Sequence, residues 1–166
     1  MKIIFVCHGN ICRSPMAEYY FRHIATRAGL ADYFQVSSAG LSNEEEGNPV
    51  YPLAKRLLAS YGIGCKDKSA RQLTVKEYLS ADMVIIMDSK NLQGFQPYLG
   101  IEPDKRVSRL LDHTLADDAE HHNRDIVDPW YPPRRFDKAW EDITIGCRAL
   151  LEELRPQAEA ALSAPK

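Results

Sequence analysis

The chain carries Cys7-His8-Gly9-Asn10-Ile11-Cys12-Arg13-Ser14-Pro15 directly after a short apolar run at residues 3–6. The apolar run is typical of a buried strand, and Pro15 is favourable in the first turn of a helix. We therefore expect a strand, a short loop and a helix that opens at Pro15. In this arrangement the backbone N–H groups of the loop and the positive end of the helix point to one spot, which predicts an anion-binding cradle.

Residues 7–14, the cysteine loop, also contain a candidate nucleophile and a candidate anion clamp. The field of the cradle favours the thiolate of Cys7, the form that attacks phosphorus in a bound phosphate. Arg13 can present a planar guanidinium to two phosphate oxygens. A cysteine with an arginine six positions later is a weak signal alone, so the specificity comes from the strand before it, the glycine in the bend and Ser14 after the arginine. The alternative is an inert cysteine buried at a strand end.

The composition bounds the class of protein. A chain of 166 residues with 45% hydrophobic residues predicts one domain over residues 1–166, with a frayed Ala-rich tail at 157–166. The net charge of −2 argues against a nucleic-acid partner. A helix that spans a bilayer needs about 20 apolar residues, and no apolar stretch of the chain is that long. We therefore expect neither a signal peptide nor membrane insertion. Four unevenly spaced cysteines do not suggest a secreted disulfide framework, which favours a cytoplasmic location.

Strand and helix patterns alternate along the chain, which is typical of a parallel sheet covered by helices. The expected strands are 3–6, 35–39, 83–87 and 107–111. Helical spacing of apolar residues follows at 15–28, 53–61 and 136–154, and Thr74 with Glu77 predicts a capping box before one more short helix. Trp140 and Cys147 fall on the apolar face of the last helix and are expected in the core.

A long polar segment, residues 112–135, separates the last strand from the last helix. Loops of this length inside a compact domain tend to be functional. Its histidines, His121 and His122, are expected to be solvated. A zinc site that joins them to Cys7 and Cys12 is the weakest alternative, because the cysteine spacing is too long for a zinc knuckle and a neighbouring arginine would repel the metal.

Residues 7–15 resemble the signature loop of the low-molecular-weight protein tyrosine phosphatases. Further segments agree in the same order, namely Ser37-Ser38-Ala39-Gly40, Ala70-Arg71-Gln72-Leu73, Met87-Asp88 with Asn91-Leu92, and Asp128-Pro129-Trp130-Tyr131. The resemblance implies an α/β fold, a four-stranded parallel sheet with helices on both faces. It also implies hydrolysis of phosphotyrosine in proteins through a cysteinyl-phosphate, with no metal and no cofactor. The implied partner is a phosphotyrosine-containing protein, of which a tyrosine kinase is one candidate.

The resemblance also implies roles for residues of the site. Cys7 attacks, Arg13 and the loop N–H groups hold the phosphoryl oxygens, and Asp128 is the general acid. The implied phosphate-binding residues are His8, Gly9, Asn10, Ile11, Cys12, Arg13 and Ser14. Ser14 would also donate a hydrogen bond to the nucleophilic sulfur, and Asn10 would pin the turn of the loop.

Asp128 precedes Pro129, so the alternative for it is a simple turn residue. In that case the acid would have to be Asp117, Asp118 or Asp125. Trp130 and Tyr131 would wall the cleft and stack on a flat aromatic substrate, or else be ordinary surface aromatics.

Three positions bear on specificity. Glu44 stands where many relatives carry an aromatic residue on the substrate-binding loop, so we assign it to the substrate cleft and expect it to disfavour acidic phosphopeptides. Lys68 stands where relatives often have a histidine that supports the cysteine loop. Ile11 agrees with the tyrosine-specific members, whereas phosphoarginine-specific relatives carry a smaller polar residue there.

Two other functions compete with this one. Arsenate reduction uses the same fold but needs two further cysteines after the third strand, where this chain reads Met87-Asp88-Ser89-Lys90-Asn91. A non-catalytic phosphoprotein-binding module would be expected to lose the nucleophile or the acid, and this chain keeps both. Family resemblance further suggests a redox-sensitive site in which oxidised Cys7 forms a protective disulfide with Cys12.

Overall fold

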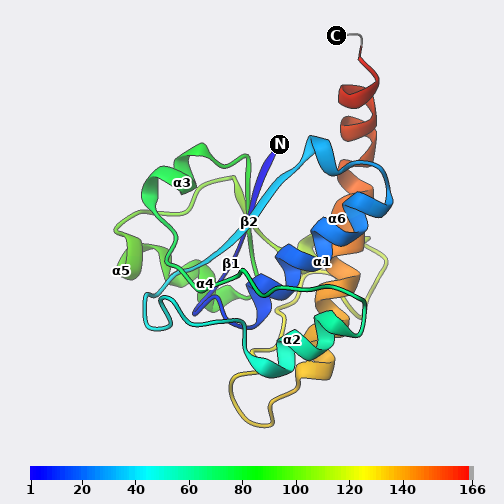
Figure 1. Ribbon diagram of the computed structural model, residues 1–166. Helices are drawn as coiled ribbons and strands as arrows, with labels where there is room; N and C mark the ends of the chain where they lie inside the picture. The colour runs from blue at the N-terminus through cyan, green and yellow to red at the C-terminus, as the bar shows by residue number, and fades with distance from the viewer. Residues whose placement is uncertain (165–166) are drawn as a thin grey trace.

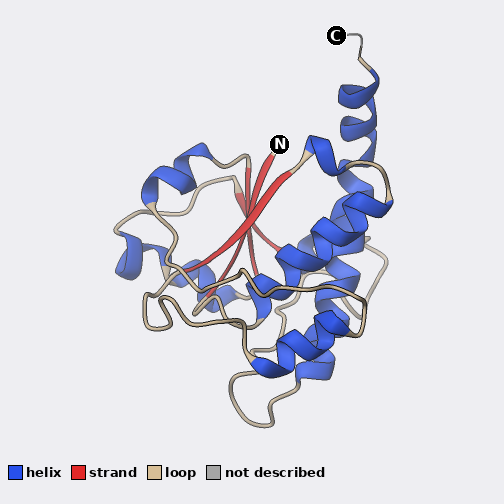
Figure 2. Ribbon diagram, viewed as in Figure 1, coloured by secondary structure: helices blue, strands red, loops and turns tan. Residues whose placement is uncertain are grey.

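The computed structural model of the protein describes residues 1–164 and contains one parallel sheet. Its four strands lie in the order β2-β1-β3-β4 (Figures 1 and 2). Their bounds are β1 (Lys2–Cys7), β2 (Gln35–Gly40), β3 (Met83–Ile86) and β4 (Val107–Arg109). The predicted four-stranded parallel sheet is therefore confirmed.

Helices cover both faces of the sheet. One face carries α1 (Arg13–Arg27), α2 (Pro52–Ala59) and α6 (Phe136–Ser163), which contact one another. The other face carries α3 (Val75–Ser80), α4 (Ser89–Gln93) and α5 (Phe95–Leu99) (Figure 1). Short 3₁₀ turns lie at η1 (Ala31–Tyr33) and η2 (Leu110–His113).

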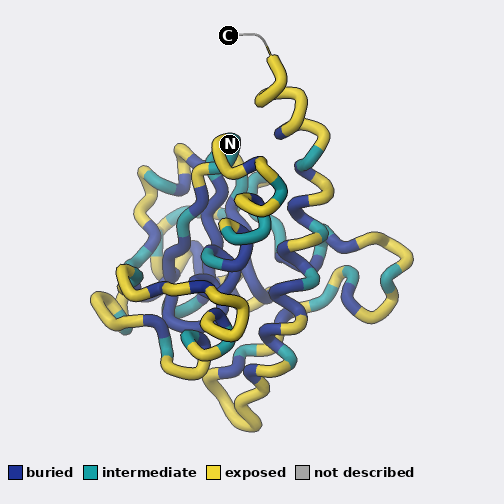
Figure 3. The backbone as a smooth tube through the Cα atoms, turned by 45° about the vertical axis from the view of Figure 1, so that its right-hand side comes forward, coloured by how far each residue is buried: buried dark blue, intermediate teal, exposed yellow. Residues whose placement is uncertain are grey.

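Alternate side chains of β1 point to opposite faces of the sheet and enter two separate cores. Ile3 and Phe5 pack into the larger core with Trp140 and Cys147 of α6, which are buried as predicted. Ile4 and Val6 pack into the smaller core, which lies under α3 and α5. Figure 3 shows the buried residues concentrated along the strands and the inward helix faces, while the C-terminal end of α6 is exposed. Within residues 1–164, no helix is long and apolar enough to cross a membrane.

Local signals placed several elements correctly. Thr74 Oγ1 accepts a hydrogen bond from Glu77 N at 3.2 Å, and the Glu77 side chain accepts one from Thr74 N at 3.1 Å, so the predicted capping box is present. Gly29 follows α1 in the left-handed conformation, at φ 72°, where the sequence predicts the helix to end.

Other boundaries differ from the sequence prediction. Helix α1 begins at Arg13 rather than Pro15, because a proline is tolerated anywhere in a first turn whose N–H groups lack helical acceptors. Strand β4 ends at Arg109, where the chain turns into η2. Residues 157–163, expected to fray, continue α6, and Ala158 is fully buried there.

The carboxyl ends of the strands meet at one edge, where the cysteine loop begins. Cys7 of β1 lies opposite Gly40 of β2, and the chain beyond Gly40 continues along the cysteine loop. Leu41 N donates to Cys7 O at 3.0 Å, and Ser42 N donates to His8 O at 3.0 Å. A Cβ at Gly40 would lie 2.8 Å from His8 O, so only glycine allows this approach of the two backbones.

Gly40→Ala is expected to lower the free energy of unfolding by about 1–3 kcal/mol, because the added methyl group meets backbone atoms that cannot move aside. Urea denaturation measures this change. Gly64→Ala is the matched control, since a Cβ at Gly64 meets no atom within 4 Å, and we expect a change below about 1 kcal/mol there. Equal effects of the two substitutions would show that the close approach at Gly40 does not limit stability.

Candidate active site

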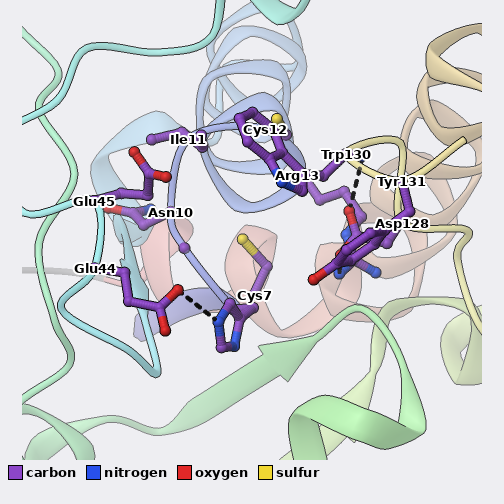
Figure 4. A pocket seen from close by; sticks show the side chains of 12 residues that line it. Cys7, Asn10, Ile11, Cys12, Arg13, Glu44, Glu45, Asp128, Trp130 and Tyr131 are labelled. Carbon is purple, nitrogen blue, oxygen red and sulfur yellow. Dashed lines mark hydrogen bonds and ion pairs between the residues drawn. The ribbon is translucent and has the colours of Figure 1, made fainter. Parts of the chain in front are cut away.

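A pocket opens at the carboxyl edge of the sheet, with the cysteine loop as its floor (Figure 4). It is lined by residues 7–13, Glu44, Glu45, Asp128, Trp130 and Tyr131. The two glutamates lie on one side, and Asp128 with the two aromatic residues lies on the other. The pocket thus brings together the predicted nucleophile, clamp, acid and cleft residues.

The sulfur of Cys7 lies against the hydroxyl of Ser14. Cys7 Sγ is 3.0 Å from Ser14 Oγ, and Asn10 Nδ2 donates to the same Ser14 oxygen at 2.8 Å. Because Ser14 Oγ already accepts from Asn10, its own hydrogen can be donated to the sulfur, and the other acceptor within reach, Ala39 O, is farther away at 3.5 Å. A thiolate at Cys7 would accept that hydrogen bond well.

Asn10 holds the turn of the cysteine loop. Its backbone is left-handed, with φ 60°, a conformation that asparagine tolerates better than most residues. Its side chain also donates to Ser38 Oγ at 2.9 Å and accepts from Arg71 N at 3.2 Å. The loop is therefore tied to β2 and to the segment before α3, the structural role that its position predicts.

Arg13 is buried and connects three segments of the chain. Its Nη1 donates to Asp88 Oδ2 at 2.6 Å and to Ile126 O at 2.9 Å, and its Nη2 lies 3.1 Å from Asp128 Oδ2. Burial alone would lower the pKa of Arg13, but the negative charges of Asp128, Cys7 and Asp88 raise it above its ordinary value. The guanidinium is therefore a fixed positive charge at the floor of the pocket.

Lys68 and Glu18 form a second buried layer below the loop. Lys68 Nζ donates to Ser38 O at 2.9 Å and lies 3.2 Å from Glu18 Oε2, to which Ser38 Oγ also donates. Burial holds the pKa of Lys68 below its ordinary value, and the adjacent Glu18 carboxylate only partly opposes this effect. Lys68 thus supports the cysteine loop indirectly. It holds Ser38, and the hydroxyl of Ser38 accepts a hydrogen bond from the Asn10 side chain of the loop.

Asp128 is the acid of the segment 112–135 that reaches this pocket. Asp125 instead accepts from Ser89 and Arg109, and Asp118 pairs with His121. His121 is 8% exposed, so the expectation that it is solvated is wrong, because it folds back onto Asp118. Among residues 1–164, no group of three or more His, Cys, Asp or Glu side chains is arranged to hold a metal ion.

Sequence reasoning missed several partners of these residues. Asp88, at the end of a central strand, is the closest ion-pair partner of Arg13, and only its place beside the carboxyl edge could have suggested this. Glu45 lines the pocket beside Glu44. Tyr51 packs edge-on against Trp130, with ring centroids 5.4 Å apart, and so supports the aromatic wall from below.

The family model described as low molecular weight phosphotyrosine protein phosphatase matches residues 2–160. The chain belongs to this family. A similar curated protein is the low molecular weight protein-tyrosine-phosphatase YfkJ of Bacillus subtilis, which is 32% identical over 159 residues, covering 96% of this chain and 99% of YfkJ. Membership places the chain in a family of hydrolases.

Solved structures of the family superpose on the whole fold. The crystal structure of YfkJ has a TM-score of 0.85 and covers 95% of this chain and 96% of its own. A mutant of YwlE arginine phosphatase, with a phosphorylated active-site serine in place of cysteine, has a TM-score of 0.77 and 31% identity. It covers 93% of this chain and 96% of its own. The family therefore includes proteins named for two different phosphorylated amino acids.

The other three cysteines of this phosphatase-family chain are poor nucleophiles. Burial raises the pKa of Cys12, Cys65 and Cys147, and the charges of Cys7 and Asp128 raise that of Cys12 further. All four thiols are free and buried. Cys7 and Cys12 line the same pocket, which is compatible with a disulfide between them. This disulfide stays a prediction.

Iodoacetamide at neutral pH is expected to modify Cys7 faster than Cys12, Cys65 or Cys147, because burial raises the pKa of these three thiols and so lowers the fraction of each that is thiolate. Peptide mapping after timed quenching measures the four rates. Inorganic phosphate in the cradle should slow labelling of Cys7 and leave Cys65 unaffected. Faster labelling of Cys12 or Cys65 would contradict the assignment of the nucleophile.

Proposed function

We propose that this chain hydrolyses phosphotyrosine in proteins through a phosphorylated Cys7, without a metal, as a single phosphatase domain over residues 1–166. One observation carries the proposal. Cys7, whose sulfur is hydrogen-bonded to the Ser14 hydroxyl, lines the same pocket as the buried guanidinium of Arg13 and the carboxyl group of Asp128. A nucleophile, an anion clamp and a proton donor are the three groups that this reaction needs.

In the first step the thiolate of Cys7 attacks phosphorus in line with the tyrosine oxygen. A sulfur–phosphorus bond forms while the phosphorus–oxygen bond breaks, and the electron pair leaves with the phenolic oxygen. The N–H groups of residues 8–14 and the guanidinium of Arg13 stabilise the charge on the three equatorial oxygens. Asp128 donates a proton to the leaving oxygen.

In the second step water attacks the phosphorus of the phosphocysteine. The Asp128 carboxylate left by the first step accepts a proton from that water. The sulfur–phosphorus bond breaks and the electron pair returns to Cys7. The hydroxyl of Ser14, 3.0 Å from the sulfur, stabilises the departing thiolate.

Phosphotyrosine is the phosphorylated side chain that suits this pocket best. Trp130 and Tyr131 line it with exposed aromatic faces, and Ile11 adds an aliphatic surface at 8% exposure. A flat phenyl ring can stack on such walls and reach down to the cysteine loop. The likeness to an arginine phosphatase makes phosphoarginine the second candidate. A cytoplasmic location and a tyrosine kinase as one partner remain predictions.

A substrate panel tests the proposed function. The protein is assayed in the presence of a chelator with an aryl phosphate, with peptides that carry phosphotyrosine, phosphoserine or phosphoarginine, and with arsenate plus a thiol reductant. We expect turnover of the aryl phosphate and of phosphotyrosine, with kcat/KM at least about tenfold above the other two peptides. Faster cleavage of phosphoarginine would reassign the substrate. Arsenate reduction would indicate the reductase, and binding without turnover would indicate a binding module.

Asp128→Asn is expected to lower kcat/KM for phosphotyrosine roughly a hundred- to ten-thousandfold, the usual loss for a general acid. Aryl phosphates with acidic phenols should lose far less, because such phenols depart as anions without a proton. Asp125→Asn is the matched control, since that acid lies in the same segment, bonds Ser89 and does not line the pocket. Equal losses for good and poor leaving groups would make Asp128 a turn residue.

A further inference from the structure

Two carboxylates stand at the mouth of a pocket built for an anion. Glu44 and Glu45 line the wall that faces Trp130 and Tyr131 across the cysteine loop (Figure 4). We propose that these two glutamates select phosphotyrosine segments that carry a lysine or arginine next to the phosphotyrosine. The proposal rests on the proposed function and names the class of protein segment that the same site prefers.

Glu45 is held in place beside the cysteine loop. Its Oε2 accepts a hydrogen bond from Asn48 Nδ2 at 2.6 Å. Its side-chain stem lies against Gly9, where an added Cβ would be 3.3 Å from Glu45 Cγ. The carboxylate is therefore already ordered at the rim, so little side-chain entropy is lost when it meets a cation of the substrate.

Glu44 is the more accessible of the two acids. Its side chain is 67% exposed, and its Oε2 lies 3.4 Å from His8 Nε2, a long contact. The imidazole of His8 in turn packs edge-on to Tyr98, with ring centroids 5.5 Å apart. An ammonium or guanidinium group from a bound peptide can therefore reach Glu44 without displacing a strong partner.

The positive charge of Arg13 at the floor of the pocket is paired with neighbouring carboxylates. Arg13 is 2% exposed and bound to Asp88 and Asp128, so its charge is directed at the phosphate and not at the rim. On the opposite side, the guanidinium of Arg134 lies 5.6 Å from the centre of the Trp130 ring, and Arg134 does not line the pocket.

The basic side chains that line the pocket are His8 and the buried Arg13, and His8 makes only the long 3.4 Å contact with Glu44. The Glu45 carboxylate pairs with the Asn48 amide and with no basic side chain among these residues, so the rim on this side is negative.

The position of Glu44 and Glu45 at the rim weakens the binding of anions that have no cation beside them. A carboxylate close to a phosphate site repels free phosphate and acidic segments alike. A basic residue beside the phosphotyrosine removes the repulsion and adds an attraction. The two glutamates therefore separate basic from acidic segments by both effects at once.

The test compares kcat/KM for two phosphotyrosine peptides that differ only in carrying lysine or glutamate on both sides of the phosphotyrosine. The variant is Glu44→Gln with Glu45→Gln. The control is Glu46→Gln, which removes one negative charge from the same loop, and each single variant, Glu44→Gln and Glu45→Gln, is compared with it charge for charge. Glu46 bonds Gln72 N at 2.9 Å and does not line the pocket. The readout is the ratio of the two peptides, which cancels any common effect on the phosphate.

We expect the wild-type protein to prefer the lysine peptide about two- to fivefold at low ionic strength, the range for an exposed ion pair. In the double variant the ratio should fall close to one, whereas the control variant should keep the wild-type ratio. Added salt should lower the ratio of the wild-type protein. Dissociation constants of the same peptides for Cys7→Ser should show the same preference. A wild-type ratio near one with normal aryl phosphate hydrolysis would overturn this inference alone. A ratio that survives in the double variant would also overturn it, and loss of all hydrolysis would overturn the proposed function with it.

Discussion

The buried guanidinium of Arg13 is the interaction on which the rest of the site depends. It contacts Asp88 at the end of β3, and Ile126 O and Asp128 in the long segment before α6. These segments are far apart in the sequence and are brought to one edge by the parallel sheet. Removing one partner from such a buried pair typically costs about 3–5 kcal/mol, because the other charge is left unpaired. The same contacts therefore stabilise the fold and hold Asp128 at the pocket that Cys7 lines.

The charges of the site are arranged in layers along the direction in which a phosphate would enter. The lowest layer is the buried pair of Lys68 and Glu18, which supports the loop through Ser38. The middle layer is the cradle of loop N–H groups with Arg13. The outer layer is the rim with Glu44 and Glu45. An anion is thus attracted by Arg13 and the loop N–H groups and repelled by the two carboxylates at the rim.

The sequence allowed most of the architecture to be predicted because its signals are local. The apolar run before Cys7, the run of β3 and the Thr74–Glu77 box each depend on a few adjacent residues, and all three appear in the structure. Helices α4 and α5 span five residues each, too few to show an apolar period. The capping signal of α4, Asp88 before Asn91, could have been recognised as a helix start, whereas α5 has no side-chain cap.

The contacts that complete the site could not be predicted in the same way, because they join residues far apart in the sequence. The bond of Lys68 to Ser38 and the ion pair of Arg13 with Asp88 depend on how the strands are ordered. Spacing along the chain carries no information on either contact. The burial of His121 likewise depends on a fold of the long segment that has no regular period.

The central claim is that phosphate passes through a covalent bond to Cys7. The most direct measurement is rapid acid quenching of the protein during turnover of an aryl phosphate, followed by mass spectrometry of its peptides and by phosphorus NMR of the quenched protein. The account predicts phosphate on the peptide that contains Cys7, with the chemical shift of a sulfur–phosphorus bond, and its absence in Cys7→Ser. Turnover without any phosphoprotein, or phosphate attached to His8 or another residue, would contradict it.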